Sequence, residues 1–445
     1  MTPQTMMIVA LVLFALTYVL MLTFSKYRHF IALGSGIVFV ALIFIFPNSF
    51  SNLEETPIKY VLSAIDWNVI LMLAGTMGLV ALFIESKMPA LLADVIMAKV
   101  PNVKWAAIAL SLFAGIISAF VDNVATVLMI APVALAVCKK LEVNPVPVII
   151  AIAVSSNLQG AATLVGDTTA IMLGSALEMS FLDFFWYQGK PSIFFAVELG
   201  AVISAIILAF IFRKETKSID KSMLTKTQVT DYVPTVLLLS VLALLIGASF
   251  IPNKPDVTNG LICCVLLVVG LVIKLCREKK LSTLVAPLKE IDLVTIGLLF
   301  GLFLMIGGID AAGVIAKLGE LFSALGKGGQ IFWLYTAIVW ASVLISAFID
   351  NIPYVATMIP VIAGIGNSLG LEPSQLTVLY FGLLSGATLG GNCTPIGASA
   401  NITGIGILRK EGYEVKNKDF FKIGIPFTLA AIVPAYIYIW LVFGI

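Results

Sequence analysis

Nine uninterrupted apolar stretches dominate the chain, and each is close to the length that crosses a bilayer as a helix. A helix needs about 17–25 mostly apolar residues to span the hydrocarbon core. The pattern therefore predicts an all-α, polytopic integral membrane protein, which we expect in a bacterial-type cell membrane. The predicted spans are Met6–Thr23, Ile31–Phe46, Asn68–Ile84, Ile193–Phe212, Val233–Ile251, Leu261–Leu275, Leu293–Ile309, Ile331–Ala347 and Gly424–Val442.

Two further regions, Trp105–Leu177 and Ile349–Leu408, are apolar but interrupted by Gly, Pro, Asn and Asp. Non-helical backbone at membrane depth is tolerated only where protein buries it or where it lines a wet cavity. We therefore expect the functional site in these two regions.

The two interrupted regions are copies of each other. The first reads SAFVDNVATVLMIAP and then SSNLQGAATLVGDTTAIMLG, whereas the second reads SAFIDNIPYVATMIP and then LLSGATLGGNCTPIGASAN. Asp122 matches Asp350, Thr163 is paired with Thr388, and Asp66 matches Asp292 in the same order. The chain is therefore predicted to be a duplication, with a first repeat at 1–230 and a second at 231–445.

The basic loops predict that the second repeat is inverted. Cytoplasmic loops collect Lys and Arg, and one threading places every basic loop inside: those with Lys26 and Arg28, Lys139 and Lys140, Arg213, Lys214, Lys217, Lys221 and Lys226, and Lys274, Arg277, Lys279 and Lys280. In that threading the span after Asp66 runs inward and the span after Asp292 runs outward. The acidic loop 178–190 then lies outside, and its basic repeat mate 409–422 lies inside.

Each repeat is predicted to hold scaffold helices, a re-entrant hairpin with a broken helix, and a closing helix. In the first repeat these parts are about 1–100, 105–178 and 192–212, and in the second about 231–325, 331–408 and 422–445. The arms Trp105–Val121 and Val124–Val137 meet at Asp122-Asn123, and Ile349–Ile365 repeats this arrangement around Asp350-Asn351. Inverted repeats with broken helices place binding sites near the bilayer midplane in secondary transporters.

The hairpin tips are the predicted cation sites. An aspartate at membrane depth costs about 2.5–3.5 kcal/mol, which is tolerated where it faces a cavity, takes up a proton or binds a cation. Na+ is expected at Asn123 and Asn351 because hard cations prefer oxygen ligands. Simple capping of the hairpin helices is the alternative for each Asp. The candidate cation-binding residues are Asp122, Asn123, Thr126, Gly160, Thr163, Asp350, Asn351 and Thr388.

The glycine-rich breaks Ser155–Asp167 and Ser385–Asn401 are the predicted substrate site. Unwinding exposes carbonyl groups and leaves a half-helix N-terminus that favours an anion, although close helix packing is the alternative for some glycines. Neither break contains Lys or Arg, so an anion would depend on helix ends, hydroxyls and a co-bound cation. The candidate substrate-binding residues are Asn157, Gly166, Asp167, Thr168, Gly391, Asn392, Thr394, Ser399 and Asn401.

Composition excludes several other classes. Only 12% of the 445 residues are charged, about half the share in soluble proteins. The net charge is +2, with five cysteines that lack CxxC spacing and one histidine. We therefore expect no nucleic-acid partner, no cofactor or zinc site, and no enzyme activity.

From about Asp66 to the C-terminus, the four quoted motifs resemble those of the ion transporter superfamily, in the branch with arsenite permeases, the melanocyte P protein and D-type sodium/proton antiporters. The resemblance implies a scaffold with a homodimer interface and a transport domain that shifts as an elevator. The more distant sodium/dicarboxylate symporters carry Ser-Asn-Thr at each hairpin tip. Here the tips read Asp122-Asn123-Val124 and Asp350-Asn351-Ile352, which argues against dicarboxylate recognition but keeps the Asn of a cation site.

The predicted function is secondary active transport of a small ion by alternating access, coupled to Na+ or H+. Cation-coupled anion transport is slightly favoured, with Na+/H+ antiport and arsenite efflux as alternatives. An ion channel would need a continuous pore lining, and the inverted repeats favour alternating access instead.

Overall fold

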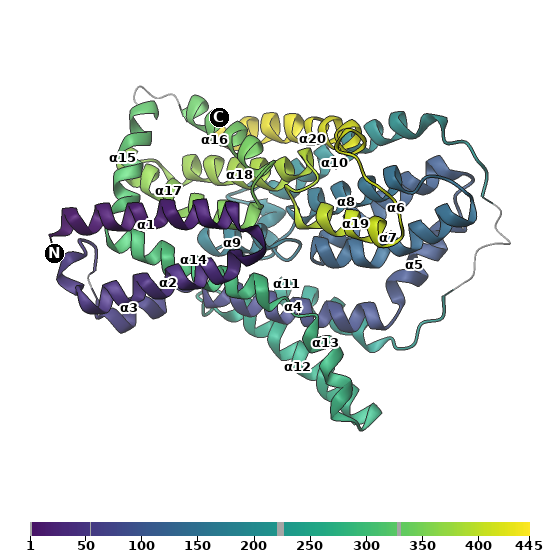
Figure 1. The fold of residues 1–445 in the computed structure, drawn as a ribbon, viewed down its shortest axis with the longest axis horizontal. Coiled ribbons are helices and arrows are strands. Elements are labelled where there is room, and N and C mark those ends of the chain that lie inside the picture. Colours follow the sequence, from purple (N-terminus) through teal and green to yellow (C-terminus); the bar gives the residue numbers. More distant parts are fainter. Residues whose placement is uncertain (1, 54, 220–226, 327–330) are drawn as a thin grey trace.

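The computed structural model describes residues 2–53, 55–219, 227–326 and 331–445, and these residues form twenty α-helices and one short antiparallel strand pair (Figure 1). Lys221 and Lys226 of the predicted cytoplasmic linker lie outside the described residues. The first repeat contains α1 (Pro3–Thr23), α2 (Arg28–Ile45), α3 (Pro57–Ser63), α4 (Trp67–Glu85), α5 (Met88–Met97), α6 (Val103–Ser118), α7 (Asn123–Lys140), α8 (Val146–Gly160), α9 (Thr168–Ala176), β1 (Trp186–Tyr187), β2 (Lys190–Pro191) and α10 (Ile193–Ile211). The second contains α11 (Val233–Ser249), α12 (Thr258–Glu278), α13 (Val285–Lys289), α14 (Leu293–Ala311), α15 (Val314–Gly326), α16 (Ile331–Ser346), α17 (Asn351–Leu369), α18 (Pro373–Gly390), α19 (Ser399–Lys410) and α20 (Asn417–Ile439).

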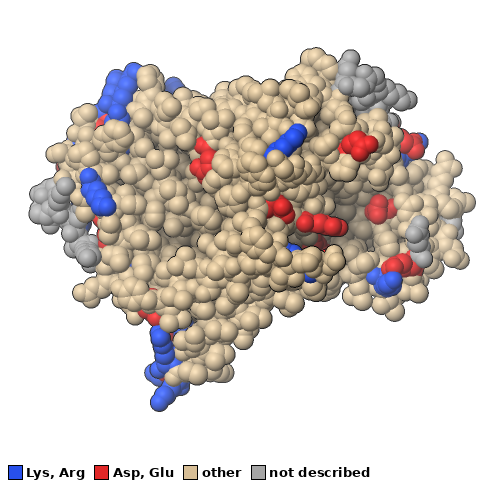
Figure 2. All heavy atoms as spheres, turned by 180° about the vertical axis from the view of Figure 1, so that it is seen from behind, with Lys and Arg blue, Asp and Glu red and all other residues tan. Residues whose placement is uncertain are grey.

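The apolar helices confirm an integral, multi-pass membrane protein. Ten helical segments of the described chain are long and apolar enough to cross a bilayer. Large apolar side chains are exposed along α1, α2, α11 and α12, as expected for a surface in contact with lipid. On the face in Figure 2, Lys, Arg, Asp and Glu are sparse.

Ile331–Ala347 is predicted both as a full span and as the start of the hairpin region 331–408, and the structure contradicts the full span. This stretch is α16, which ends at Ser346, turns, and leads directly into α17 from Asn351. It is therefore the first arm of the second hairpin, equivalent to α6 in the first. A hairpin arm buried in protein is as apolar as a helix in lipid, so hydropathy could not separate the two.

Aspartates begin equivalent helices in both repeats. Asp66 accepts a hydrogen bond from the Val69 amide at the start of α4, and Asp292 accepts one from the Thr295 amide at the start of α14, both at 3.0 Å. Such caps satisfy amides that have no partner within the helix. The matching caps fix where each scaffold helix starts.

In the scaffold bundle, formed by α1–α4 and α11–α14, helices of one repeat pack against helices of the other. α2 packs along α14 and α12 packs along α4. A side chain at Gly301 would clash with the backbone of Ala32, and one at Gly75 would clash with the backbone of Cys263. These two close crossings are repeat mates, so Ala32 and Cys263 occupy equivalent places on α2 and α12.

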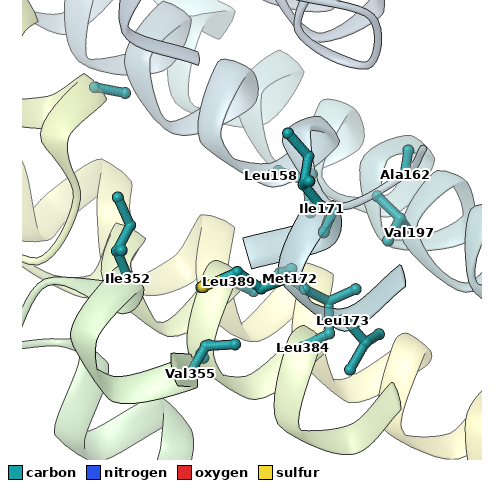
Figure 3. Close-up of a cluster of buried hydrophobic side chains, with 14 of the residues drawn as sticks. Leu158, Ala162, Ile171, Met172, Leu173, Val197, Ile352, Val355, Leu384 and Leu389 are labelled. Carbon is teal, nitrogen blue, oxygen red and sulfur yellow. The ribbon is translucent and has the colours of Figure 1, made fainter. Parts of the chain in front are cut away.

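The hairpin bundle, formed by α6–α10 and α16–α20, is the second body, with α6 and α7 toward one end of the molecule and α16 and α17 toward the other (Figure 1). Its core joins the two repeats. Figure 3 shows Met172 of α9 beside Leu389 of α18, with Val355 of α17 in the same cluster. All three side chains are at most 3% exposed. Through this buried apolar core, α9, the second half of the first broken helix, packs against α17 and α18 of the opposite repeat.

Candidate functional site

A cavity of about 140 Å³ lies where both hairpin tips and both helix breaks meet the scaffold bundle; we call it the tip cavity. It lies beside the starts of α2 and α14, at the end of the scaffold bundle predicted to be cytoplasmic. From the hairpin bundle its polar lining includes Asp122, Asn123, Asp167, Thr168, Asn351 and Ser399. From the scaffold and its loops it includes Arg28, Glu290, Asp292 and Thr295.

Each helix break folds against its own hairpin tip. The Thr163 hydroxyl donates to the carbonyl of Ala119, and the Thr394 hydroxyl donates to the carbonyl of Ala347. A Cβ atom at Gly166 would lie 2.6 Å from the carbonyl oxygen of Gly160. Gly397 and Gly391 show the same close approach at 2.6 Å. Glycine is therefore required here because the chain passes its own backbone without room for a side chain.

The pairing of Thr163 with Thr388 is wrong. Thr163 and Thr394 make the same contact in the two repeats, so they are the true mates, and Thr388 corresponds to Asn157 instead. The error arose because both breaks are rich in Gly and Thr, and a shift of a few residues still matches similar letters. The corrected register pairs Asp167 with Ala398, so the second repeat has no carboxylate at this place.

A buried amide chain joins the two breaks behind the cavity. Asn123 Nδ2 donates to Asn157 Oδ1 at 3.0 Å, and Asn157 Nδ2 donates to the carbonyl of Thr388 at 2.7 Å and to Asn392 Oδ1 at 3.1 Å. Asn392 Nδ2 donates in turn to the carbonyl of Val154 at 2.9 Å. These groups use their hydrogen-bonding capacity on one another. They hold the site together across the repeats.

Asp122 and Asp167 both begin helices and both face the cavity. Asp122 Oδ2 accepts from the amides of Val124 and Ala125 at 3.0 and 3.2 Å. Asp167 Oδ1 accepts from the Thr168 amide at 2.8 Å, and its Oδ2 accepts from the Asn351 side chain of the opposite hairpin at 3.4 Å. Capping and a role in the cavity are therefore compatible, because each carboxylate caps a helix and also lines the cavity.

Asp350 carries an ion pair that the sequence did not predict. Its Oδ1 accepts from the Ile352 amide at 3.1 Å, while its Oδ2 lies 2.6 Å from Arg28 Nη1 and 3.2 Å from Ser399 Oγ. Arg28 was predicted only as part of a cytoplasmic loop. No local motif marks it, and the contact joins residues 322 positions apart. Asp292 was noted as a repeat marker, but its place in the lining was also missed.

The remaining predicted residues lie behind the lining. Thr126 is buried, with its hydroxyl 3.5 Å from the carbonyl of Val121. Asn401 Nδ2 donates to the carbonyls of Gly391 and Thr394, each at 3.1 Å. Within the described residues, Asn401 Oδ1 has no hydrogen-bond partner. The oxygen atoms around the tip cavity suit a hard cation, although no group of three His, Cys, Asp or Glu side chains gathers in the described part of the chain.

A second, larger cavity of about 890 Å³ lies between the two bundles at the opposite end; we call it the outer cavity. Asp66 and Asn259 line it on the scaffold side, and Ala356 of α17 and Ser175 of α9 line it on the other. Asp66 is the repeat mate of Asp292, which lines the tip cavity. The two cavities therefore occupy related positions on opposite sides of the scaffold.

The helices and cavities define a multi-pass membrane transporter, and comparison with known proteins gives its family. The family model described as "Citrate transporter" matches residues 11–386, so the chain belongs to the citrate transporter family, within the ion transporter superfamily. The chain is 30% identical to an uncharacterized transporter of Mycobacterium bovis over 98% of both chains. It is 26% identical to the human P protein over 85% of this chain and 54% of that protein. The crystal structure of the Alcanivorax borkumensis YdaH transporter, reported to have an unusual topology, covers 93% of this chain and 98% of its own with a TM-score of 0.59 and 14% identity, which shows a shared fold. These matches confirm the superfamily that the motifs resemble.

Proposed function

We propose that this protein is a secondary active transporter that moves a small ion by alternating access, with Na+ or H+ as the coupling ion. The observation that carries the proposal is the tip cavity, where carboxylates from both repeats face a small space beside two broken helices. Membrane-embedded carboxylates that face a cavity mark ion pathways. The transport role of the family points away from an enzyme.

The two cavities support alternating access. They lie at opposite ends of the boundary between the scaffold bundle and the hairpin bundle. Movement of the hairpin bundle along this boundary, as an elevator, would close one cavity and open the other. Inverted repeats supply the two related conformations that this movement needs.

Cation-coupled transport of an anion remains the favoured form of this proposal. Asp122, Asp167 and Asp292 make the lining acidic, so an anion would bind only together with a neutralising cation. The half-helices that begin at Thr168 and Ser399 add N-terminal partial charge. The family description makes citrate the first anion to test.

Exchange of Na+ for H+ is the second candidate, and Asp122 Oδ1, which has no hydrogen-bond partner within the described residues, favours it. Asp122 Oδ2 caps α7, which leaves Oδ1 for a proton or a cation. A carboxylate that alternates between the two would couple the flows without an anion. Arsenite efflux has no observation in its favour beyond the resemblance.

A sodium jump on liposomes that contain the purified protein and a pH-sensitive dye separates these forms. Without added anion, a sodium-dependent change of internal pH indicates exchange. A response that needs citrate indicates cation-coupled anion transport. Failure of both additions to move Na+, H+ or citrate would refute the proposed function.

Asp122→Asn is expected to lower the sodium-dependent signal about tenfold, the effect of losing about 1.4 kcal/mol of cation binding. Asn can still cap α7, so the fold should persist while the charge is lost. Asp231→Asn, at the surface beside α11, is the matched control and should transport normally. Equal activity of the two variants would contradict a cation role for Asp122.

We also infer a homodimer, formed through the scaffold bundle. Val236, Leu239, Val265 and Val268 give α11 and α12 an exposed apolar surface that either lipid or a second copy could cover. Native mass spectrometry of the protein released from detergent should show a dimer. A monomer at every detergent and lipid level would contradict this inference.

A further inference from the structure

We propose that Arg28 is a built-in competitor for the transported cation: it occupies Asp350 in this conformation, and the ion must displace it. Arg28 thereby sets both cation affinity and the resting conformation, as a positioning residue. This inference rests on the proposed function, since it assumes cation binding and two conformations.

The contact between Arg28 and Asp350 is a sheltered ion pair across the two bundles. The side chain of Asp350 is 8% exposed and that of Arg28 is 25% exposed, with 2.6 Å between Nη1 and Oδ2. Arg28 begins α2 in the scaffold bundle, whereas Asp350 begins α17 in the hairpin bundle. Breaking a buried pair leaves an uncompensated charge, which is strongly unfavourable. The pair therefore fastens one bundle to the other.

A second residue of the same scaffold corner holds the same turn of α17. The Tyr18 hydroxyl donates to the carbonyl of Pro353 at 2.7 Å and also contacts the Thr357 hydroxyl. Tyr18 and Arg28 lie on α1 and α2, on either side of one short connection. Together they fix the first two turns of the second hairpin against the scaffold.

The repeat mate of Arg28 carries no charge. Arg28 precedes Ala32 by four residues, and Asn259 precedes Cys263 by four residues, so the equivalent crossings of α2 and α12 pair Arg28 with Asn259. Asn259 lines the outer cavity and is 5% exposed, and its Oδ1 has no partner within the described residues. In the reversed conformation, each hairpin would take the position that its repeat mate has here. The Asn259 amide, and not a guanidinium group, would then lie near Asp122. The ion pair belongs to one conformation only.

The tip cavity gives Arg28 its competitive role. Among the described residues of that lining, Arg28 is the single basic side chain, against Asp122, Asp167, Glu290 and Asp292. Asp350 lies just behind this lining, where its Oδ2 contacts two residues that do line the cavity, Arg28 and Ser399. A cation that approached Asp350 would meet the guanidinium charge in a poorly screened space. Cation binding and the Arg28 contact therefore weaken each other, and by linkage the effect is reciprocal.

The experiment measures the distance between spin labels at Lys280, after α12 of the scaffold bundle, and Lys410, at the end of α19. Both side chains are exposed, and the five native cysteines are first replaced. The purified protein is labelled in lipid nanodiscs and titrated with Na+. The variants are Arg28→Gln, which removes the charge, and Arg28→Lys, which keeps it. Arg277→Gln is the matched control, because Arg277 pairs with Asp231 at the surface, away from the cavity.

Without Na+, Arg28→Gln should raise the population of a second distance about tenfold, and the Na+ midpoint should fall about tenfold, within the usual range of such coupling. Arg28→Lys should resemble the wild type more closely than the Gln variant does, and Arg277→Gln should match it.

Unchanged distances in Arg28→Gln would overturn the proposal. If the wild type responds to Na+, a changed distance in Arg28→Gln with an unchanged Na+ midpoint would overturn it as well. A wild type that ignores Na+ would refute sodium coupling in the proposed function. In that case the conformational part of the inference stands if Arg28→Gln still shifts the distance, and it falls if the distance does not move.

Discussion

Replacing Asp167 with asparagine is expected to abolish ion-coupled transport and to weaken cation binding about 30-fold or more. Asp167 is 4% exposed and lines the tip cavity. Its repeat mate is Ala398, so no equivalent carboxylate can substitute for it. The charge pair in question is that between Asp167 and the bound cation. Loss of one charge from such a buried pair costs about 2 kcal/mol or more, which is about 30-fold in affinity. Radiolabelled Na+ binding to purified protein, followed by flux in liposomes, measures both effects.

The fold of this variant should survive, because the Asn Oδ1 can still accept the capping hydrogen bond that Asp167 Oδ1 accepts from the Thr168 amide, while the Thr169 hydroxyl, which donates to Asp167 Oδ2, can instead accept from the Asn Nδ2. Asp419→Asn is the matched control, since Asp419 is partly exposed near the start of α20 and outside the tip-cavity lining, 3.8 Å from Lys422. It should bind and transport as the wild type does. Wild-type flux in Asp167→Asn, at equal thermal stability, would remove Asp167 from the site.

Much of the architecture could be predicted from sequence because lipid imposes simple rules. Long apolar runs, basic loops and the duplicated Asp-Asn motif led to an all-α membrane protein. Asp122 and Asp167 were recognisable because a carboxylate within an apolar segment is unfavourable unless it has a role. Both line one cavity in the structure.

One error has a simple physical cause: burial in protein and burial in lipid leave the same apolar pattern. The arm α16 therefore looked like a full span. Thr388 was paired with Thr163 because residue types alone do not show which threonine hydroxyl contacts the preceding hairpin; the structure shows that it is Thr394. Arg28 could not be placed because its partner lies in the other repeat. Long-range electrostatic contacts have no period in the sequence.

The two repeats differ chemically at several places, although their backbones are related, and two of these differences change the charge at the site. Asp167 of the first repeat corresponds to Ala398 of the second, and Arg28 corresponds to Asn259. Inverted repeats with identical lining would give two conformations of equal energy. In the proposed alternating-access cycle, the Arg28 side chain would pair with Asp350 in one conformation, whereas Asn259 could form no such ion pair in the other. The direction of the resting state can therefore be set by single side chains on a nearly symmetrical scaffold.

The glycines of the breaks are expected to be as critical as the carboxylates, for steric reasons. Gly166→Ala should destabilise the protein by about 1–3 kcal/mol or more, the cost of overpacking, and should abolish transport. A Cβ atom there would lie 2.6, 2.8 and 2.9 Å from the carbonyl oxygens of Gly160, Ser118 and Ala119. All three are backbone atoms, so no side-chain rotation can relieve the clash. Thermal unfolding in detergent measures the loss of stability.

The second repeat supplies the replicate and α19 supplies the control. Gly397→Ala should behave like Gly166→Ala, because its Cβ would lie 2.6 Å from the carbonyl oxygen of Gly391 and 2.8 Å from that of Ala347. Gly406→Ala meets nothing within 4 Å and should be neutral or stabilising by about 0.5–1 kcal/mol, the usual gain of Ala over Gly inside a helix. If Gly166→Ala were as stable and active as Gly406→Ala, the breaks would not hold the hairpin tips in place. The carboxylates would then owe their positions to the amide chain around Asn157 alone.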